Sequence, residues 1–190
     1  DCTPCAAGSF GSSTGADSSD ACEPCRAGTY SAAGSGQCDT CPPGESSPVG
    51  ASRCTKCDPG TYSGADDLVC RLCPVGTWSN KSGLASAGDC TPCAAGTFSG
   101  ETAQISAATC RPCRAGTYSD ASGQGFCLAC GEGSSSESGA SECHECSPGT
   151  YSGVDDFGIC KRCPVGTWSN KSGLASAGDC TPCAAGTFGS

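Results

Sequence analysis

The chain has few of the side chains from which proteins build an interior. Its 190 residues include no Met, eleven aromatic residues and few Leu, Ile or Val. A globular chain of this length usually buries one sizeable core, and this composition does not supply one. We therefore expect covalent cross-links to take over part of the role of apolar burial.

Positive charge and long apolar runs are also scarce. Ten Lys and Arg stand against nineteen Asp and Glu, which gives a net charge of −9. Nucleic-acid recognition needs clusters of Lys and Arg, so we expect no nucleic-acid partner. The acidic residues are scattered and favour solubility. No run of 18 apolar residues occurs, so we expect no membrane span in this segment.

Histidine is nearly absent, which limits the catalytic arrangements that the chain can form. No Ser/His/Asp or Cys/His arrangement can be assembled around the single His144, so we expect no enzyme, and no catalytic residue is assigned. No signal peptide is recognisable and residue 1 is Asp rather than Met. We therefore expect the sequence to be part of a longer secreted chain.

Cysteine is the abundant residue. The chain has 22, above the roughly 8–10% that marks a disulfide scaffold. Such a density is typical of oxidising compartments, so we expect an extracellular protein, secreted or on the cell surface. All 22 fall in eleven Cys-x-x-Cys pairs, here called doublets, which open at Cys2, Cys22, Cys38, Cys54, Cys70, Cys90, Cys110, Cys127, Cys143, Cys160 and Cys180.

The spacing of the doublets repeats with a period of five. We call a module the stretch from the second cysteine of one doublet to the next doublet. The steps between doublets are 17, 13, 13, 13, 17, then 17, 14, 13, 14 and 17 residues, and Cys73–Phe98 is identical to Cys163–Phe188. We predict a first five-module super-repeat at 2–89, a second at 90–179 and the start of a third at 180–190. Recent duplication without selection on the period is the alternative.

Every module carries Gly three residues after its opening cysteine, here called the module glycine. A position filled only by Gly usually needs a positive φ or a close backbone approach, so we predict a tight turn. A short extended Thr–aromatic–Ser piece follows, whose aromatic ring we expect to pack on a disulfide. The module glycines are Gly8, Gly28, Gly44, Gly60, Gly76, Gly96, Gly116, Gly133, Gly149, Gly166 and Gly186.

Gly, Pro and Ser interrupt every window, which excludes long helices. We predict a small disulfide-rich fold, mostly loops with short β-hairpins and under a third of its residues in regular structure. Proline lies inside five doublets and stiffens the joints between modules. Because each module buries little alone, we expect stacking into an elongated tandem-repeat rod with no single hydrophobic core.

Two disulfide patterns fit the doublets. One joins two doublets as first-to-third and second-to-fourth, and so uses doublets in pairs although the period holds five. The other closes each spacer locally and leaves Cys2 and Cys183 for neighbouring repeats. We favour the local pattern, although sequence alone does not prove a connectivity. It joins Cys5–Cys22, Cys25–Cys38, Cys41–Cys54, Cys57–Cys70, Cys73–Cys90, Cys93–Cys110, Cys113–Cys127, Cys130–Cys143, Cys146–Cys160 and Cys163–Cys180.

The doublets have other conceivable uses. Their spacing is also that of zinc sites, but they form an unbroken series with one histidine. Thioredoxin-like redox chemistry would need a βαβ context that is missing. We therefore expect no metal and no cofactor. For the acidic pairs Asp66–Asp67 and Asp155–Asp156 we favour solvated turn residues, and calcium binding stays open.

Two N-glycosylation sequons lie one super-repeat apart. They begin at Asn80 and Asn170, each followed by Lys and Ser. In a secreted chain we predict covalent glycans at both. The alternative is a chance Asn in a Ser-rich loop that was duplicated.

The motif Cys-x-x-Gly-Thr-aromatic-Ser, seen best at Cys57–Ser63 and Cys73–Ser79, resembles the ephrin-receptor-like cysteine-rich repeat. That repeat is similar in style to tumour-necrosis-factor-receptor and EGF-like modules. The resemblance implies disulfides that close the small loops. It also implies one of two settings: spacers or ligand-contact modules in receptor ectodomains, or long arrays in algal and protist surface and fibrous proteins, including mastigonemes (flagellar hairs).

The near-identical super-repeats differ from receptor arrays, whose modules usually diverge. Our first hypothesis is a structural repeat segment of a secreted, glycosylated extracellular filament or surface coat, such as a mastigoneme-like fibre. Its partner would be a homopolymer or another fibre component, bound through lateral repeat contacts. The alternative is a ligand-binding or spacer stalk of a cell-surface receptor or adhesin.

Overall fold

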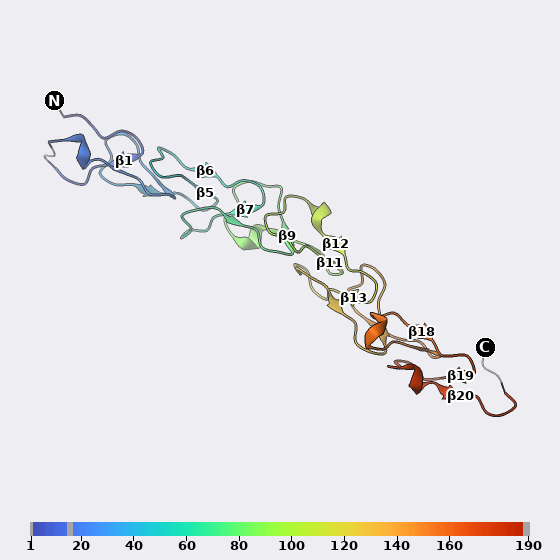
Figure 1. The fold of residues 1–190 in the computed structure, drawn as a ribbon. Helices are drawn as coiled ribbons and strands as arrows, with labels where there is room; N and C mark the ends of the chain where they lie inside the picture. Colours follow the sequence, from blue (N-terminus) through green and yellow to red (C-terminus); the bar gives the residue numbers. More distant parts are fainter. Residues whose placement is uncertain (1, 15–16, 188–190) are drawn as a thin grey trace. The chain divides into compact units, whose positions relative to one another are not determined.

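The computed structural model describes residues 2–14 and 17–187, and in them the chain forms loops, two-residue strands and single turns of 3-10 helix. It divides into two compact units. Unit 1 comprises Asp1–Thr91 and Thr102–Ala107, and unit 2 comprises Pro92–Glu101 and Ala108–Ser190. Within each unit the hairpins follow one another in chain order (Figure 1). The aromatic residue expected at Phe188 lies outside the described residues.

Unit 1 consists of consecutive antiparallel hairpins. In each, the strand after a module glycine pairs with the strand between the two cysteines of the next doublet; Thr29 faces Thr40 and Tyr30 faces Asp39, for example. The pairs are β1 (Ser9–Phe10) with β2 (Glu23–Pro24), β3 (Thr29–Tyr30) with β4 (Asp39–Thr40), β5 (Glu45–Ser46) with β6 (Thr55–Lys56), and β7 (Thr61–Tyr62) with β8 (Arg71–Leu72). Two further strands follow, β9 (Thr77–Trp78) and β10 (Thr91–Pro92).

Unit 2 repeats the same scheme. Its hairpins pair β11 (Thr97–Phe98) with β12 (Arg111–Pro112), β13 (Thr117–Tyr118) with β14 (Leu128–Ala129), β15 (Ser134–Ser135) with β16 (His144–Glu145), β17 (Thr150–Tyr151) with β18 (Lys161–Arg162), and β19 (Thr167–Trp168) with β20 (Thr181–Pro182). A threonine closes most turns. Thr167 Oγ1, for instance, donates a hydrogen bond to Pro164 O at 2.7 Å.

The longer spacers accommodate their extra residues as a turn of 3-10 helix. Each 17-residue step contains one. The helices are η1 (Ser19–Ala21), η2 (Ala87–Asp89), η3 (Ala107–Thr109), η4 (Val154–Asp156) and η5 (Ala177–Asp179). At η2 and η5 a carboxylate caps the turn; Asp89 Oδ2, for example, accepts hydrogen bonds from Ala85 N and Ser86 Oγ at 3.1 and 3.0 Å.

Burial is local, and most of the buried apolar residues are cysteines. Nearly all of the buried apolar residues among those described are cysteines, joined by Leu84 and Leu174 at 8% exposure each. The prediction of a disulfide-rich fold of short hairpins and loops, with no single hydrophobic core, is confirmed. The two leucines were not predicted as buried, because they lie in Gly/Ser-rich loops without any apolar periodicity.

Candidate functional site

Ten disulfides join successive doublets along the described chain, with Cα–Cα distances of 5.5–6.0 Å. Each links the second cysteine of one doublet to the first cysteine of the next, which are the pairs of the local pattern. Cys2 is exposed and Cys183 half-buried, and neither is disulfide-bonded in the described part of the chain. Every doublet between them therefore belongs to two consecutive disulfide loops.

In seven modules the module glycine connects its module to the next through both of its backbone polar groups. Gly28 N donates to Ser47 O, and Gly28 O accepts from Cys41 N, both at 2.9 Å. This pair of hydrogen bonds to the following module recurs at Gly8, Gly44, Gly60, Gly96, Gly116 and Gly133. Buried backbone groups need such partners, and here the neighbouring module provides them.

The same glycine also allows contact with the module after next. At Gly60, φ is +76°, and a Cβ placed there would lie 2.5 Å from Ala103 O, which belongs to a loop two modules later. Positive φ is found at all eleven module glycines. The predicted turn conformation is confirmed, and Gly60 meets both conditions at once, a left-handed backbone and a close approach.

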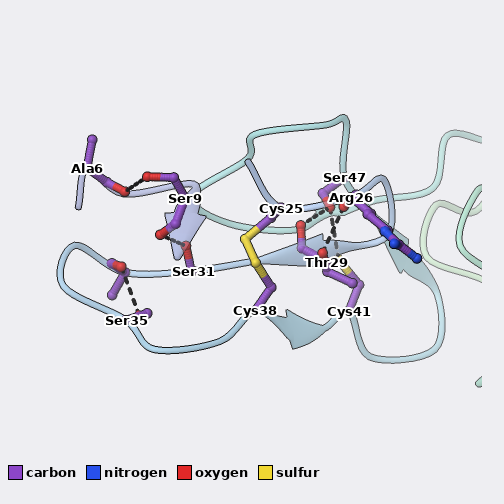
Figure 2. Close-up of a disulfide and its surroundings, with 11 residues drawn as sticks. Ala6, Ser9, Cys25, Arg26, Thr29, Ser31, Ser35, Cys38, Cys41 and Ser47 are labelled. Atoms are coloured by element: carbon purple, nitrogen blue, oxygen red, sulfur yellow. Dashed lines mark hydrogen bonds between the residues drawn. A yellow bond between two sulfur atoms is a disulfide. The ribbon is translucent and has the colours of Figure 1, made fainter. Parts of the chain in front are cut away.

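A buried serine adds a contact that sequence reasoning missed. Ser47, 5% exposed, donates from Oγ to Thr29 O of the preceding module at 2.8 Å (Figure 2), and Ser31 Oγ donates likewise to Ser9 O at 2.9 Å. Ser136 donates in the same way to Thr117 O, whereas Ser63, Ser79 and Ser119 form hydrogen bonds within their own loops. The buried Oγ of Ser152 has no hydrogen-bond partner among the described residues. The buried members are Ser31, Ser47, Ser63, Ser79, Ser99, Ser119, Ser136 and Ser152. Their recurrence after the aromatic position was the available signal.

The aromatic position behaves as predicted in one module and is partly exposed in another. Tyr62 packs against a small cluster of Cys73, Leu84 and Cys90, so its ring covers the disulfide between those cysteines. Trp168 is 49% exposed, so its side chain is covered only in part.

The acidic pairs cap loops, and one member of each is largely shielded from solvent. Asp67 accepts from Gly64 N at 2.9 Å and forms an ion pair with Arg71 at 2.7 Å, with 13% of its side chain exposed. The expectation of solvated turn residues is therefore wrong for Asp67, although it holds for Asp66, which is exposed. The second super-repeat has the same arrangement.

In that second copy, Asp156 accepts from Gly153 N at 2.8 Å and forms an ion pair with Lys161, while Asp155 is exposed. The hydrogen bond from Lys161, supported by that from Gly153 N, lowers the pKa of Asp156 below its ordinary value of 3.8. The carboxylate in turn raises the pKa of Lys161 above 10.5. Both carboxylates that face inward are thus used by the chain's own donors.

The predicted glycosylation residues occupy equivalent places. Asn80 and Asn170 are both exposed in the loop after a tryptophan. In each loop the next backbone N–H, of Lys81 or Lys171, donates to the Oγ of the serine before the asparagine at 3.1 Å. The two sequons therefore present the same local conformation.

Other chemistry finds little support in the described ranges 2–14 and 17–187. They contain no group of three or more His, Cys, Asp or Glu placed to hold a metal ion. His144 is exposed, 3.9 Å from Glu142 and inside a disulfide-bonded doublet. The same residues include no helix long and apolar enough to cross a membrane.

Comparison with known proteins agrees with the repeat type. The family model described as tyrosine-protein kinase ephrin type A/B receptor-like matches residues 100–141 and 133–180. No curated protein matches the chain. Ten disulfides in tandem modules, together with this similarity, indicate a non-enzymatic extracellular module of structural or receptor-like type, built of cysteine-rich repeats.

Proposed function

We propose that this chain is a structural repeat segment of a secreted, glycosylated extracellular filament or surface coat, of the kind found in mastigonemes. The observation that carries the proposal is the recurrence of one exposed surface in both super-repeats. Asn80 with Lys81, and Asn170 with Lys171, are exposed in identical segments one period apart. A fibre that repeats the same lateral contacts needs such equivalent surfaces, and contacts of this kind that do not close generate filaments.

The super-repeats 2–89 and 90–179, with the start of a third at 180–190, are the proposed structural period. Glycans on Asn80 and Asn170 would then decorate the fibre once per period. Expression in a secreting eukaryotic cell tests this part. We expect removal of N-glycans by glycosidase to lower the mass by two glycans in the wild type, by one in Asn80→Gln, and by none in the double variant.

The fibre itself is tested by negative-stain imaging of assemblies formed by the secreted chain and of filaments purified from its source. We expect an axial repeat that stays constant along each filament and corresponds to one super-repeat. Particles that remain monomeric over a wide concentration range, with no filament in which the chain is found, would contradict the proposal.

A ligand-binding or spacer stalk of a receptor or adhesin is the second candidate. It is favoured by the match to the receptor-like family over residues 100–180. This candidate predicts a separate ligand domain and a membrane span encoded elsewhere in the full gene. It also predicts binding to a partner that saturates at one site per chain and does not repeat with the super-repeat.

A further inference from the structure

We propose that the chain is a tether of limited extension, in which the ten disulfides and the short strands between them carry end-to-end load while the loops carry none. The inference deepens the proposed function, since a filament segment transmits tension. It depends on covalent connectivity and on strand conformation within the doublets.

The load path follows from the way that doublets are shared. A pulling force on Cys25 is transmitted to Cys38 through one disulfide, whose Cα–Cα distance is 5.8 Å. The 13-residue step between the two cysteines is not needed to transmit it. Cys41 then receives the load across the doublet and passes it to Cys54 in the same way. Because every internal doublet joins two disulfides, this path continues through all ten.

The doublets are already extended. Strand β4 fills the doublet that runs from Cys38 to Cys41, and its backbone has the strand conformation, with a rise of roughly 3.3–3.4 Å per residue. The two residues between the cysteines form a strand in every doublet from Cys22–Cys25 to Cys180–Cys183. Tension can therefore straighten the path, but it finds little slack within each link.

The loops lie outside this path and are held by hydrogen bonds to the preceding module. Gly50 N donates to Cys25 O, and Gly83 N donates to Cys57 O, both at 2.8 Å. Breaking these bonds frees the loop but does not lengthen the tether, because the disulfide still bridges its ends. Reduction is what adds the loop to the load path.

The two thiols outside the ten disulfides, Cys2 and Cys183, are natural attachment points for a single-molecule stretching experiment. The path between them crosses eleven doublets and ten disulfides, so its fully extended length is about 170 Å. Without disulfides the same 181 residue steps would reach about 620 Å. We expect the extension of the oxidised chain to stop near the first value, and the reduced chain to reach about 3.6 times that length.

Two variants sharpen the test, because they remove disulfides of different loop size. Replacing Cys73 and Cys90 by Ser adds a 17-residue step to the path and should lengthen the stretched chain by about 53 Å. Replacing Cys41 and Cys54 by Ser adds a 13-residue step and should lengthen it by about 39 Å. The remaining nine disulfides stay in place in either variant.

An oxidised chain that extends well beyond about 170 Å, or equal increments for the two variants, would overturn the inference. The measurement uses one isolated molecule. Its result therefore does not depend on filament formation, and a failure of the fibre proposal would leave it unchanged. If the filament is found but the oxidised chain extends freely, the fibre stands and the load path is wrong.

Discussion

Cys73–Thr97 and Cys163–Thr187 have the same sequence, but the loop that follows the first at residues 103–104 has no counterpart within the 190 residues after the second. In the first, Ala103 N donates to Cys73 O at 3.0 Å and Ser79 N donates to Gln104 O at 2.8 Å, so a later loop of the same unit covers the turn. Cys73 and Ser79 are 0% and 2% exposed, whereas their counterparts in the second segment are half-buried.

The hairpin itself is the same in both copies. Thr77 N and Thr167 N donate to the carbonyls of Pro74 and Pro164 at 3.2 and 3.0 Å, and the Cα–Cα distances of the disulfides are 6.0 and 5.9 Å. The comparison shows that a module's own residues determine its turn, strand and disulfide. Burial is added by the modules that follow, as expected for a repeat protein stabilised by nearest neighbours.

The largest expected effect comes from filling a module glycine in contact with a later loop. Gly60 and Gly149 are equivalent positions with φ of +76° and +79°, but an added Cβ meets Ala103 O at Gly60 and no described atom within 4 Å at Gly149. Both alanine variants should lose about 1–2 kcal/mol of unfolding free energy to the left-handed backbone. Gly60→Ala should lose about 1–3 kcal/mol more through overpacking. Equal losses of unfolding free energy for the two variants, measured by denaturant titration, would contradict the proposed difference between Gly60 and Gly149.

A buried serine should matter more where the next module covers it. Ser79 is 2% exposed, and its Oγ accepts a hydrogen bond from Lys81 N. Ser79→Ala removes this acceptor from a covered site, which should cost about 1–2 kcal/mol of unfolding free energy. Ser169→Ala removes the same hydrogen bond at a half-buried site, where water can replace it, so we expect at most about 0.5 kcal/mol. Denaturant titrations of both variants measure the difference, and the reverse order would contradict our interpretation.

The capped loop of Asp156 should make the stability of the fold depend on pH. The lowered pKa of Asp156 means that its ion pair stabilises the fold above 3.8 and is lost as the pH falls through the folded value. The raised pKa of Lys161 means that the same ion pair is fully present below 10.5 and is lost as the pH rises through the folded value.

We therefore expect the stability difference between the wild type and Asp156→Asn to shrink at both acidic and strongly alkaline pH. Thermal unfolding measured across the pH range, with the thiols of Cys2 and Cys183 alkylated to prevent disulfide exchange, provides the test. A stability difference that stays constant from neutral to strongly alkaline pH would contradict the assignment of the ion pair with Lys161.

The smallest expected effect is on the quenching of tryptophan fluorescence. Trp168 is 49% exposed, while Trp78 is half-buried and lies beside Gln104 in a short parallel bridge. Each variant, Trp78→Phe or Trp168→Phe, leaves a single tryptophan. We expect acrylamide to quench the fluorescence of Trp168 more strongly than that of Trp78, and equal quenching would show that the two environments do not differ in solution.

Much of the local structure could be read from residue type. The positive φ of the module glycines and the short hairpins follow from a position that only Gly occupies and from the adjoining Thr and aromatic. These features depend on residues close together in sequence, so the repeat displays them directly.

The contacts between modules could not be predicted in the same way. The hydrogen bond of Ser47 to Thr29, and the approach of Ala103 to Gly60, join residues that lie in different disulfide loops. Leu84 is buried because it packs with Tyr62 and with the disulfide of Cys73, and no periodic pattern in its loop indicates this contact. Such features depend on the stacking of modules, which is held by backbone hydrogen bonds that every residue type except proline can donate, so residue type does not reveal them.

The most direct test is a mass-spectrometric disulfide map of the unreduced, secreted chain, with free thiols alkylated before digestion. It should recover ten linkages between the second cysteine of one doublet and the first of the next, from Cys5–Cys22 to Cys163–Cys180. Linkages that join the first cysteine of a doublet to the first of another, or twenty alkylated thiols in place of bridges, would contradict the account.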